Sequence, residues 1–209
     1  MNPKPQTNAL PPRDIPLQRS IQLLEVKRVA PCERFDDFVG NCGMFELGRT
    51  TDTQDLEGVV VRTAPYEGIL RADVERVMRE VASRGMQTPP IFSALKRGGK
   101  AMHRIARQLR TAPAAQQATL PVLEPRTAIV HEVRLESFSA PHAEFFLRVA
   151  KGFYVRTFCH DVGESLGCGA VLTQLVRTRI GPHSLEDACG PEDFGKDHEG
   201  LQRFFRRAA

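Results

Sequence analysis

The chain has 209 residues, a formal net charge of +4 and an isoelectric point near 8.9. Hydrophobic residues make up 41% and charged residues 26%, which is ordinary for a soluble globular protein, and no apolar run is long enough to cross a membrane. The composition therefore excludes a membrane-spanning protein, allows one domain with a substantial core, and is compatible with a nucleic-acid partner without requiring one.

The N-terminal stretch, residues 1–20, predicts an extended or disordered tail, because it is rich in proline and polar residues. It has no apolar core of a secretion signal, and a mitochondrial presequence stays open because Asp14 is its first acidic residue. Residues 20–29, SIQLLEVKRV, fit a strand and a short helix equally well. The folded domain is expected over residues 21–190.

The clearest element is a helix over residues 73–84. Val74, Val77, Met78 and Val81 form an apolar stripe at helical spacing, Asp73 is suited to cap the first turn, and Gly85 ends the helix. We expect this stripe to pack on a sheet.

A basic segment comes next, QTPPIFSALKRGGKAMHRIARQ, residues 87–108. Its two prolines stiffen the chain, and Gly98 and Gly99 allow a tight turn or a close approach to a partner. Cations beside adaptable backbone suit contacts with phosphate groups, whereas the plainer alternative is a solvated basic hairpin that leads into a helix. The expected RNA contacts here are Ser93, Lys96, Arg97, Lys100, His103, Arg104 and Arg107.

The second half predicts strands and then helices. Residues 111–125 read as a connecting loop, and residues 127–155 form a β-hairpin with its turn at SAPH. Helices are expected over residues 157–166 and, more briefly, over residues 169–182, and the sequence from Ser184 to Asp187 has the form of a capping box. This order favours an α+β fold with a central, mainly antiparallel mixed sheet. Residues 191–209, ending in LQRFFRRAA, are expected to form a basic and aromatic tail that either docks on RNA or a protein or is frayed.

The cysteines predict reduced thiols in an intracellular protein. Their number is odd, and no two have C-x-x-C spacing. Cys159 and His160 are neighbours in a predicted helix and point apart, which argues against a metal there. We therefore expect no metal and no cofactor. The five positions are Cys32, Cys42, Cys159, Cys168 and Cys189.

Three segments, in order, resemble the TruB-type pseudouridine synthases, which convert a uridine in the T-loop of tRNA. FELGRTTDTQDLEGVVV is similar to that family's L-G-x-x-T-D-T-x-D-x-x-G segment, and the basic segment is similar to its P-P-x-x-S-A-x-K-x-x-G segment. KGFYVRTFCHDVGESLGCGAVLTQLVRTRIGPHSLEDA is similar to the family's long segment that begins with G-x-Y-I-R. The resemblance covers residues 33–190. It implies a pseudouridine-synthase-like fold and an RNA-binding role for the basic segment, and it adds Arg177 and Arg179 to the expected RNA contacts.

The resemblance also assigns pocket positions. Arg156 matches the family's arginine that pairs with the catalytic aspartate, and Tyr154 matches the tyrosine that lies under the target base. Leu175 matches an apolar wall of the pocket, and Lys151 matches a lysine just before the motif. Asn41 stands where the family has a tyrosine that stacks on the base, and an amide cannot replace that aromatic surface. His103 also stands where the family often has tyrosine.

The family's catalytic aspartate loop, G-H-x-G-x-L-D-P, is not found here. Asp14, in RDIPLQ, is the nearest candidate, but it lacks the flanking glycines. Without the family's aspartate, Arg156 is expected to pair with a substitute acid, with backbone carbonyls or with an RNA phosphate, because a buried unpaired guanidinium is costly.

Three hypotheses remain for the activity. The chain is a non-catalytic RNA-binding homologue that serves as a structural or assembly component of a ribonucleoprotein, with a mitochondrial ribosome as one setting. In the second, it is an active synthase in which Asp14 or a diverged local loop supplies the carboxylate. In the third, the chain is a fragment, and another polypeptide or a missing exon supplies the catalytic loop. Mitochondrial and cytoplasmic locations both stay open.

Overall fold

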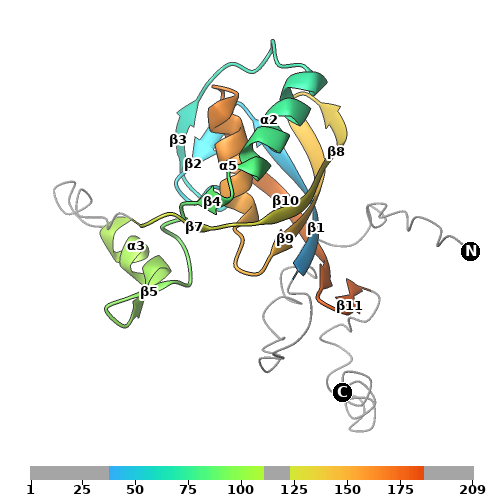
Figure 1. Cartoon of the computed structure of the whole chain (residues 1–209). Coiled ribbons are helices and arrows are strands. Elements are labelled where there is room, and N and C mark those ends of the chain that lie inside the picture. Colours follow the sequence, from blue (N-terminus) through green and yellow to red (C-terminus); the bar gives the residue numbers. More distant parts are fainter. Residues whose placement is uncertain (1–37, 111–122, 186–209) are drawn as a thin grey trace, which may run out of the picture.

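The computed structural model describes residues 38–110 and 123–185 (Figure 1). The expected tails at 1–20 and 191–209, the segment 20–29 and almost all of the 111–125 loop lie outside these ranges, as does Asp14. In the described part of the chain, no helix is long and apolar enough to cross a membrane.

A five-stranded sheet forms the centre of the fold. Its strand order is β11-β10-β1-β9-β8, and each neighbouring pair is antiparallel. The strands are β1 (Phe38–Leu47), β8 (Val130–Ser139), β9 (His142–Ala150), β10 (Ala170–Ile180) and β11 (His183–Ser184). The predicted hairpin of residues 127–155 is confirmed as β8 and β9, and the α+β fold is confirmed with it.

Two helices cover one face of this sheet (Figure 1). They are α2 (Arg71–Ser83) and α5 (Val155–Ser165), which match the predicted helices at 73–84 and 157–166. Val74, Val77, Met78 and Val81 are buried as expected. The helix α2 begins two residues earlier than predicted, and Asp73 acts from its third position, where its carboxylate accepts the backbone N–H of Leu70 at 3.1 Å.

The predicted helix at 169–182 is wrong, because these residues form strand β10. Strand β10 pairs with β1 from Val39↔Ile180 to Leu47↔Ala170. Two register shifts in this pairing leave Thr173 and Thr178 of β10 as extra residues, and they break the strict alternation along β10 that would have marked a strand. A short apolar run without alternation does not distinguish helix from strand by period alone. Ser184 is the last residue of β11 and Leu185 after it has a helical (3-10) conformation, whereas Asp187 lies outside the described ranges, so the capping box stays a prediction.

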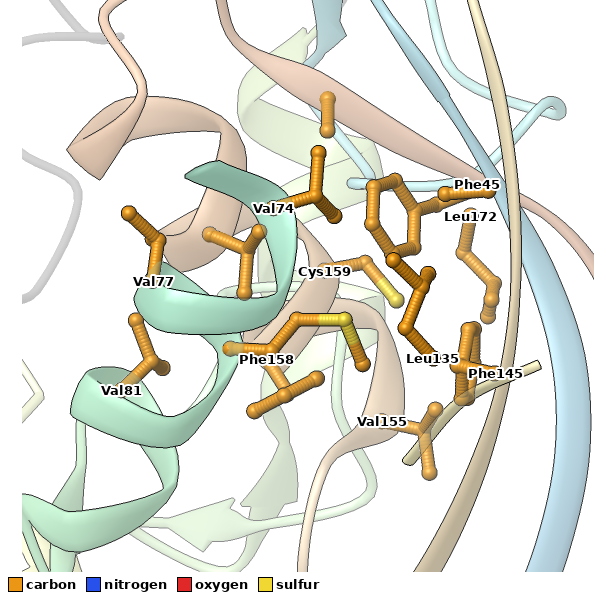
Figure 2. Close-up of a cluster of buried hydrophobic side chains, with 14 of the residues drawn as sticks. Phe45, Val74, Val77, Val81, Leu135, Phe145, Val155, Phe158, Cys159 and Leu172 are labelled. Carbon is orange, nitrogen blue, oxygen red and sulfur yellow. The ribbon is translucent and has the colours of Figure 1, made fainter. Parts of the chain in front are cut away.

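The core lies between the helices and the sheet. Phe158 and Cys159 of α5, Phe45 of β1 and Phe145 of β9 are almost fully buried in it (Figure 2). Gly163 allows α5 to approach β10, because a Cβ at this position would overlap the backbone of Gly169 and Ala170. Close packing therefore fixes α5 relative to the sheet.

Four short pieces complete the described fold. A ribbon of β2 (Arg49–Thr51) and β3 (Val60–Thr63) comes after β1, and β4 (Met86–Gln87) pairs with β7 (Arg126–Thr127). Strands β5 (Lys96–Arg97) and β6 (Lys100–Ala101) form a small hairpin that leads into helix α3 (Met102–Arg110). We call residues 96–110 the arm, because they project away from the sheet and its two helices (Figure 1). The hairpin-then-helix prediction for the basic segment is confirmed.

Candidate functional site

An ion pair stands at the start of α5. Arg156 donates from Nη1 to Oδ2 of Asp55 at 2.9 Å, and from Nη2 to the backbone carbonyl of Phe92. The side chains of Arg156 and Asp55 are 24% and 25% exposed, so the pair is largely withdrawn from water. Arg156 therefore has an acid and a backbone carbonyl of its own chain as partners, as expected for an arginine without the catalytic aspartate, and the acid belongs to the T-D-T-x-D motif.

Asp55 is held by the turn that comes after β2. Its Oδ1 accepts the Thr53 hydroxyl at 2.6 Å and the backbone N–H of Glu57 at 3.1 Å, and its backbone carbonyl accepts the Thr51 hydroxyl at 2.7 Å. Gln54 adopts a positive φ of 66° in this turn. Since both carboxylate oxygens of Asp55 already accept hydrogen bonds, this group orients the guanidinium of Arg156 and is a weak nucleophile.

Two glutamines fix the backbone on either side of the ion pair. Gln87 holds Tyr154 from both directions: its Oε1 accepts the Tyr154 N–H and its Nε2 donates to the Tyr154 carbonyl, each at 2.9 Å. Gln54 accepts the Thr157 hydroxyl at 2.8 Å, and its backbone carbonyl accepts the N–H of Leu172 in β10 at 3.1 Å. The half-buried Tyr154 and Arg156 are thereby positioned relative to the 51–59 turn and the sheet.

A second group of predicted pocket residues lies on the sheet itself. Asn41 of β1 is opposite Arg177 of β10, and Gly43 is opposite Leu175, so the side chains of Asn41, Leu175 and Arg177 share the face that bears the core. Asn41 is fully buried. It donates to the Val39 carbonyl at 3.2 Å, but its Oδ1 has no hydrogen-bond partner in the described structure.

Arg177 has no compensating charge among the described residues. Its Nε is buried without a hydrogen-bond partner, and burial lowers the pKa of this guanidinium from its ordinary value. Leu172 of β10 forms an isolated β-bridge with Asp55. Arg177 is five residues further along β10, which is about 15 Å from Leu172 in an extended strand. The predicted pocket positions thus lie on β1, on β10 and at the start of α5.

Arg177 and Arg179 lie on opposite faces of the sheet, because a register shift separates their partners on β1. The Arg179 guanidinium lies 5.7 Å from the ring centre of Phe38, on the face that the helices leave open. A single flat RNA surface cannot contact both of these arginines, although each remains a predicted contact on its own.

The arm presents most of the remaining predicted RNA contacts. Lys96, Lys100, His103 and Arg104 line a hollow of about 440 Å³ together with Gly99, Ala101 and Gln108. No acidic residue occurs anywhere in residues 81–123, and none lines this hollow. Arg107 is exposed on the same helix. A hollow lined by cations and lacking acids favours an anion.

The other predicted positions are more varied. Ser93 is 3% exposed and its hydroxyl has no hydrogen-bond partner in the described structure, whereas Lys151 is exposed in the turn after β9. The strand β5 includes Arg97, but the structure does not describe its side chain. Asp14 lies outside the described residues, so its catalytic role stays a prediction.

Three residues that hold the site together were not predicted from the sequence: Asp55, Gln54 and Gln87. Asp55 was visible as the last acid of the T-D-T-x-D motif.

The described cysteines are free and buried. Burial raises the pKa of Cys42 to about 11 and raises the pKa of Cys159 and Cys168 as well. No group of three or more His, Cys, Asp or Glu residues in ranges 38–110 and 123–185 is placed to hold a metal ion.

Comparison with known proteins matches the chain to two family models in succession. Residues 42–155 match the TruB family pseudouridylate synthase N-terminal domain, and residues 156–203 match the tRNA pseudouridylate synthase B C-terminal domain. The first of these models alone covers more than half of the chain.

Curated relatives agree with these matches. The chain is 35% identical over 164 residues to tRNA pseudouridine synthase B of Pseudomonas fluorescens strain Pf-5, covering 76% of this chain and 50% of the relative. It is 38% identical over 146 residues to the Opitutus terrae protein of the same name, covering 70% and 57% of the two chains. It is also 32% identical over 148 residues to pseudouridylate synthase TRUB1 of Mus musculus, covering 71% and 41%. The chain thus spans about half the length of these relatives.

The fold matches that of a solved structure, a Cbf5-Nop10-Gar1 complex. The TM-score is 0.51 at 21% identity, with 82% of this chain and 40% of the other chain covered. At this identity the match bears on the fold alone.

Proposed function

Because this chain belongs to the TruB family of pseudouridine synthases, we propose that it is an RNA-binding member that does not itself isomerise uridine. The observation that carries the proposal is the pairing of Arg156 with Asp55. In the family this arginine pairs with the nucleophile. Among the described residues here, the one carboxylate that Arg156 contacts is Asp55, the last acid of the T-D-T-x-D motif, and no second acid stands in the nucleophile's place.

The chemistry of the ion pair supports this proposal. A nucleophilic carboxylate must have a free oxygen that attacks the base and later leaves. One oxygen of Asp55 receives Arg156, and the other receives the Thr53 hydroxyl and the Glu57 N–H. Attack by either oxygen would break these contacts in a site that is three-quarters shielded from water, which is costly. Asn41, in place of an aromatic residue, gives the base no stacking surface.

RNA binding is supported by the arm. Its cations converge on one hollow, and the chain has no acid near them in sequence to neutralise them internally. Phosphates are the abundant anions of RNA, and proteins position themselves on RNA mainly through such contacts.

A protein of this family that binds RNA but does not isomerise uridine would contribute to a ribonucleoprotein as a structural component. We propose that the protein acts inside the cell, in the mitochondrion or the cytoplasm, as a structural or assembly component, with a mitochondrial ribosome as one candidate setting. The test is to purify the tagged protein from cells and to identify the RNA and proteins that accompany it. Recovery with a large ribosomal or other ribonucleoprotein particle is expected, whereas recovery with free tRNA alone would contradict this role.

A second function is favoured by the retention of Tyr154 and Arg156 at the motif positions. In this alternative the protein is an active synthase on tRNA T-loop uridine, and Asp14 or a carboxylate from another chain is the nucleophile. Purified protein is incubated with uridine-labelled tRNA, and pseudouridine is measured for the wild type, Asp14→Ala and Asp55→Ala. No product from the wild type is expected. Product that is lost only in Asp14→Ala would establish the alternative, and product lost only in Asp55→Ala would make Asp55 catalytic.

A further inference from the structure

The arm contains a histidine whose ring is fixed by its own backbone neighbourhood. The carbonyl of Ser93 accepts the backbone N–H of His103 at 3.0 Å, and Nδ1 of the same residue lies 3.2 Å from that oxygen. A carbonyl oxygen only accepts hydrogen bonds, so Nδ1 must carry a proton to make this contact. The neutral tautomer of His103 therefore has its proton on Nδ1 and a lone pair on Nε2.

The other ring nitrogen is the one left for a partner. Within the described residues, Nε2 of His103 has no hydrogen-bond partner. The ring is half-buried and lines the hollow of about 440 Å³, where the charged side chains beside it are Lys96 and Lys100 of the hairpin and Arg104 of α3. No carboxylate faces the ring from any of these elements.

The helix N-terminus alone does not explain the hollow. The first backbone N–H groups of α3 are already used, since Met102 donates to the Leu95 carbonyl at 2.7 Å and His103 donates to Ser93. The side chains that line the hollow are therefore the groups to consider for holding an anion. Three of these side chains are ammonium or guanidinium groups, and the fourth is the imidazole of His103.

From this geometry we propose that the hollow binds one RNA phosphate and that His103 joins the contact only when its Nε2 is protonated, so that RNA binding takes up a proton. The inference rests on the proposed RNA-binding function and adds to it a named phosphate site. With its lone pair on Nε2, neutral His103 would face the phosphate oxygens with another acceptor. With both nitrogens protonated, it donates to Ser93 on one side and to the phosphate on the other.

The sign of the pH effect is set by this protonation. Lowering the pH protonates imidazole side chains and adds a charged donor to the hollow, whereas raising the pH removes it. RNA affinity should therefore rise by about threefold to tenfold between pH 8 and pH 6, the range in which histidine changes charge. The permanent cations contribute equally at both pH values.

The test uses the full chain and a fluorescein-labelled tRNA T-arm hairpin, with the dissociation constant measured by anisotropy at constant ionic strength at each pH. His103→Asn is the decisive variant, because its side-chain amide keeps a donor for the Ser93 carbonyl but does not titrate. We expect tighter binding at low pH for the wild type and no pH dependence for His103→Asn. Lys100→Gln is the matched control and should bind more weakly at both pH values with the wild-type ratio between them.

Calorimetry in buffers of different ionisation enthalpy provides a second readout. RNA binding by the wild type should take up a fraction of a proton near pH 7, and binding by His103→Asn should take up none. A pH ratio unchanged in His103→Asn, or wild-type binding that does not depend on pH, would overturn the proton-linked site and leave RNA binding intact. No RNA binding at either pH would instead overturn the proposed function.

Discussion

The start of α5 and the arm both present positive charge, but only at α5 is the charge paired with an acid. At α5, Arg156 has an acid at 2.9 Å, and the acid in turn has further donors of its own. In the arm, Lys96, Lys100 and Arg104 surround a hollow that no acid lines. The positive charge of Arg156 is neutralised within the chain and fixes the local geometry. The cations of the arm have no acid in their hollow and are therefore available to an anionic partner.

Arg177 is intermediate between these two regions. It is withdrawn from water like Arg156, yet it has no acidic partner in the described structure, like the arm cations. A buried guanidinium nitrogen without a hydrogen-bond partner, as at Nε of Arg177, costs stability. Its retention in a strand of the core sheet is therefore consistent with a role in binding.

The largest expected effect comes from a substitution that disrupts the packing of α5 on the sheet, which supports both regions. Gly163→Val would place a side chain into the backbone of Gly169 and Ala170, where rigid strand and helix leave no room to relax. We expect a loss of about 4 kcal/mol or more in the free energy of unfolding, or no soluble protein. Urea denaturation measures this, with Gly68→Ala as the control because a Cβ there meets nothing within 4 Å. Equal stability of the two variants would refute the close contact.

The next largest effect, on RNA affinity, is expected from removing three positive charges from the arm. Changing Lys96, Lys100 and Arg104 to Gln together should weaken RNA binding by about 100-fold and reduce the slope of log affinity against log salt by about 2 to 3. The melting temperature should stay that of the wild type, because all three side chains are exposed. The matched control changes Arg62, Arg76 and Arg79 to Gln, three exposed arginines that already pair with acids. If both triple variants lose RNA equally, the contrast between paired and unpaired cations is wrong.

Breaking the ion pair at α5 should mainly affect stability. Asp55→Ala leaves the Arg156 guanidinium with the Phe92 carbonyl and removes the acceptor of Thr53 and Glu57, so we expect a loss of about 2 kcal/mol. Glu164→Ala, which breaks the exposed pair with Arg62, should cost less than about 1 kcal/mol. Thermal and urea unfolding compare the two. RNA affinity should change little in either variant. A selective loss of RNA binding in Asp55→Ala would show that the Arg156–Asp55 pair belongs to the RNA-binding surface.

The smallest expected effect tests Arg177. Replacing this arginine by methionine removes a half-buried charge whose Nε has no partner and keeps most of the side-chain volume, so the protein should gain up to about 1 kcal/mol of stability. RNA affinity should fall if Arg177 is a contact. Arg179→Met, on the opposite face of the sheet, is the control and should leave stability within about 0.5 kcal/mol. A destabilised Arg177→Met would show that this guanidinium has a partner that stabilises the fold.

Local pattern was enough for several elements. The stripe from Val74 to Val81 predicted α2, the alternation of Phe145, Leu147 and Val149 predicted β9, and the spacing of Phe158 and Val162 predicted α5. Each of these signals repeats within a few residues, so it survives without knowledge of the rest of the chain. The family resemblance and the lack of acids beside the arm were equally readable, because both are properties of contiguous segments.

Only the tertiary structure decided the features that depend on distant residues. Strand β10 exists because β1, more than a hundred residues earlier, pairs along it, and the bulges of that pairing place Arg177 and Arg179 on opposite faces. Asp55 meets Arg156 across 101 residues because the 51–59 turn attaches to β10 at Leu172 while Gln87 holds Tyr154. Strand pairing and ion-pair choice are set by which segments the core brings together, and no local period in the sequence encodes that.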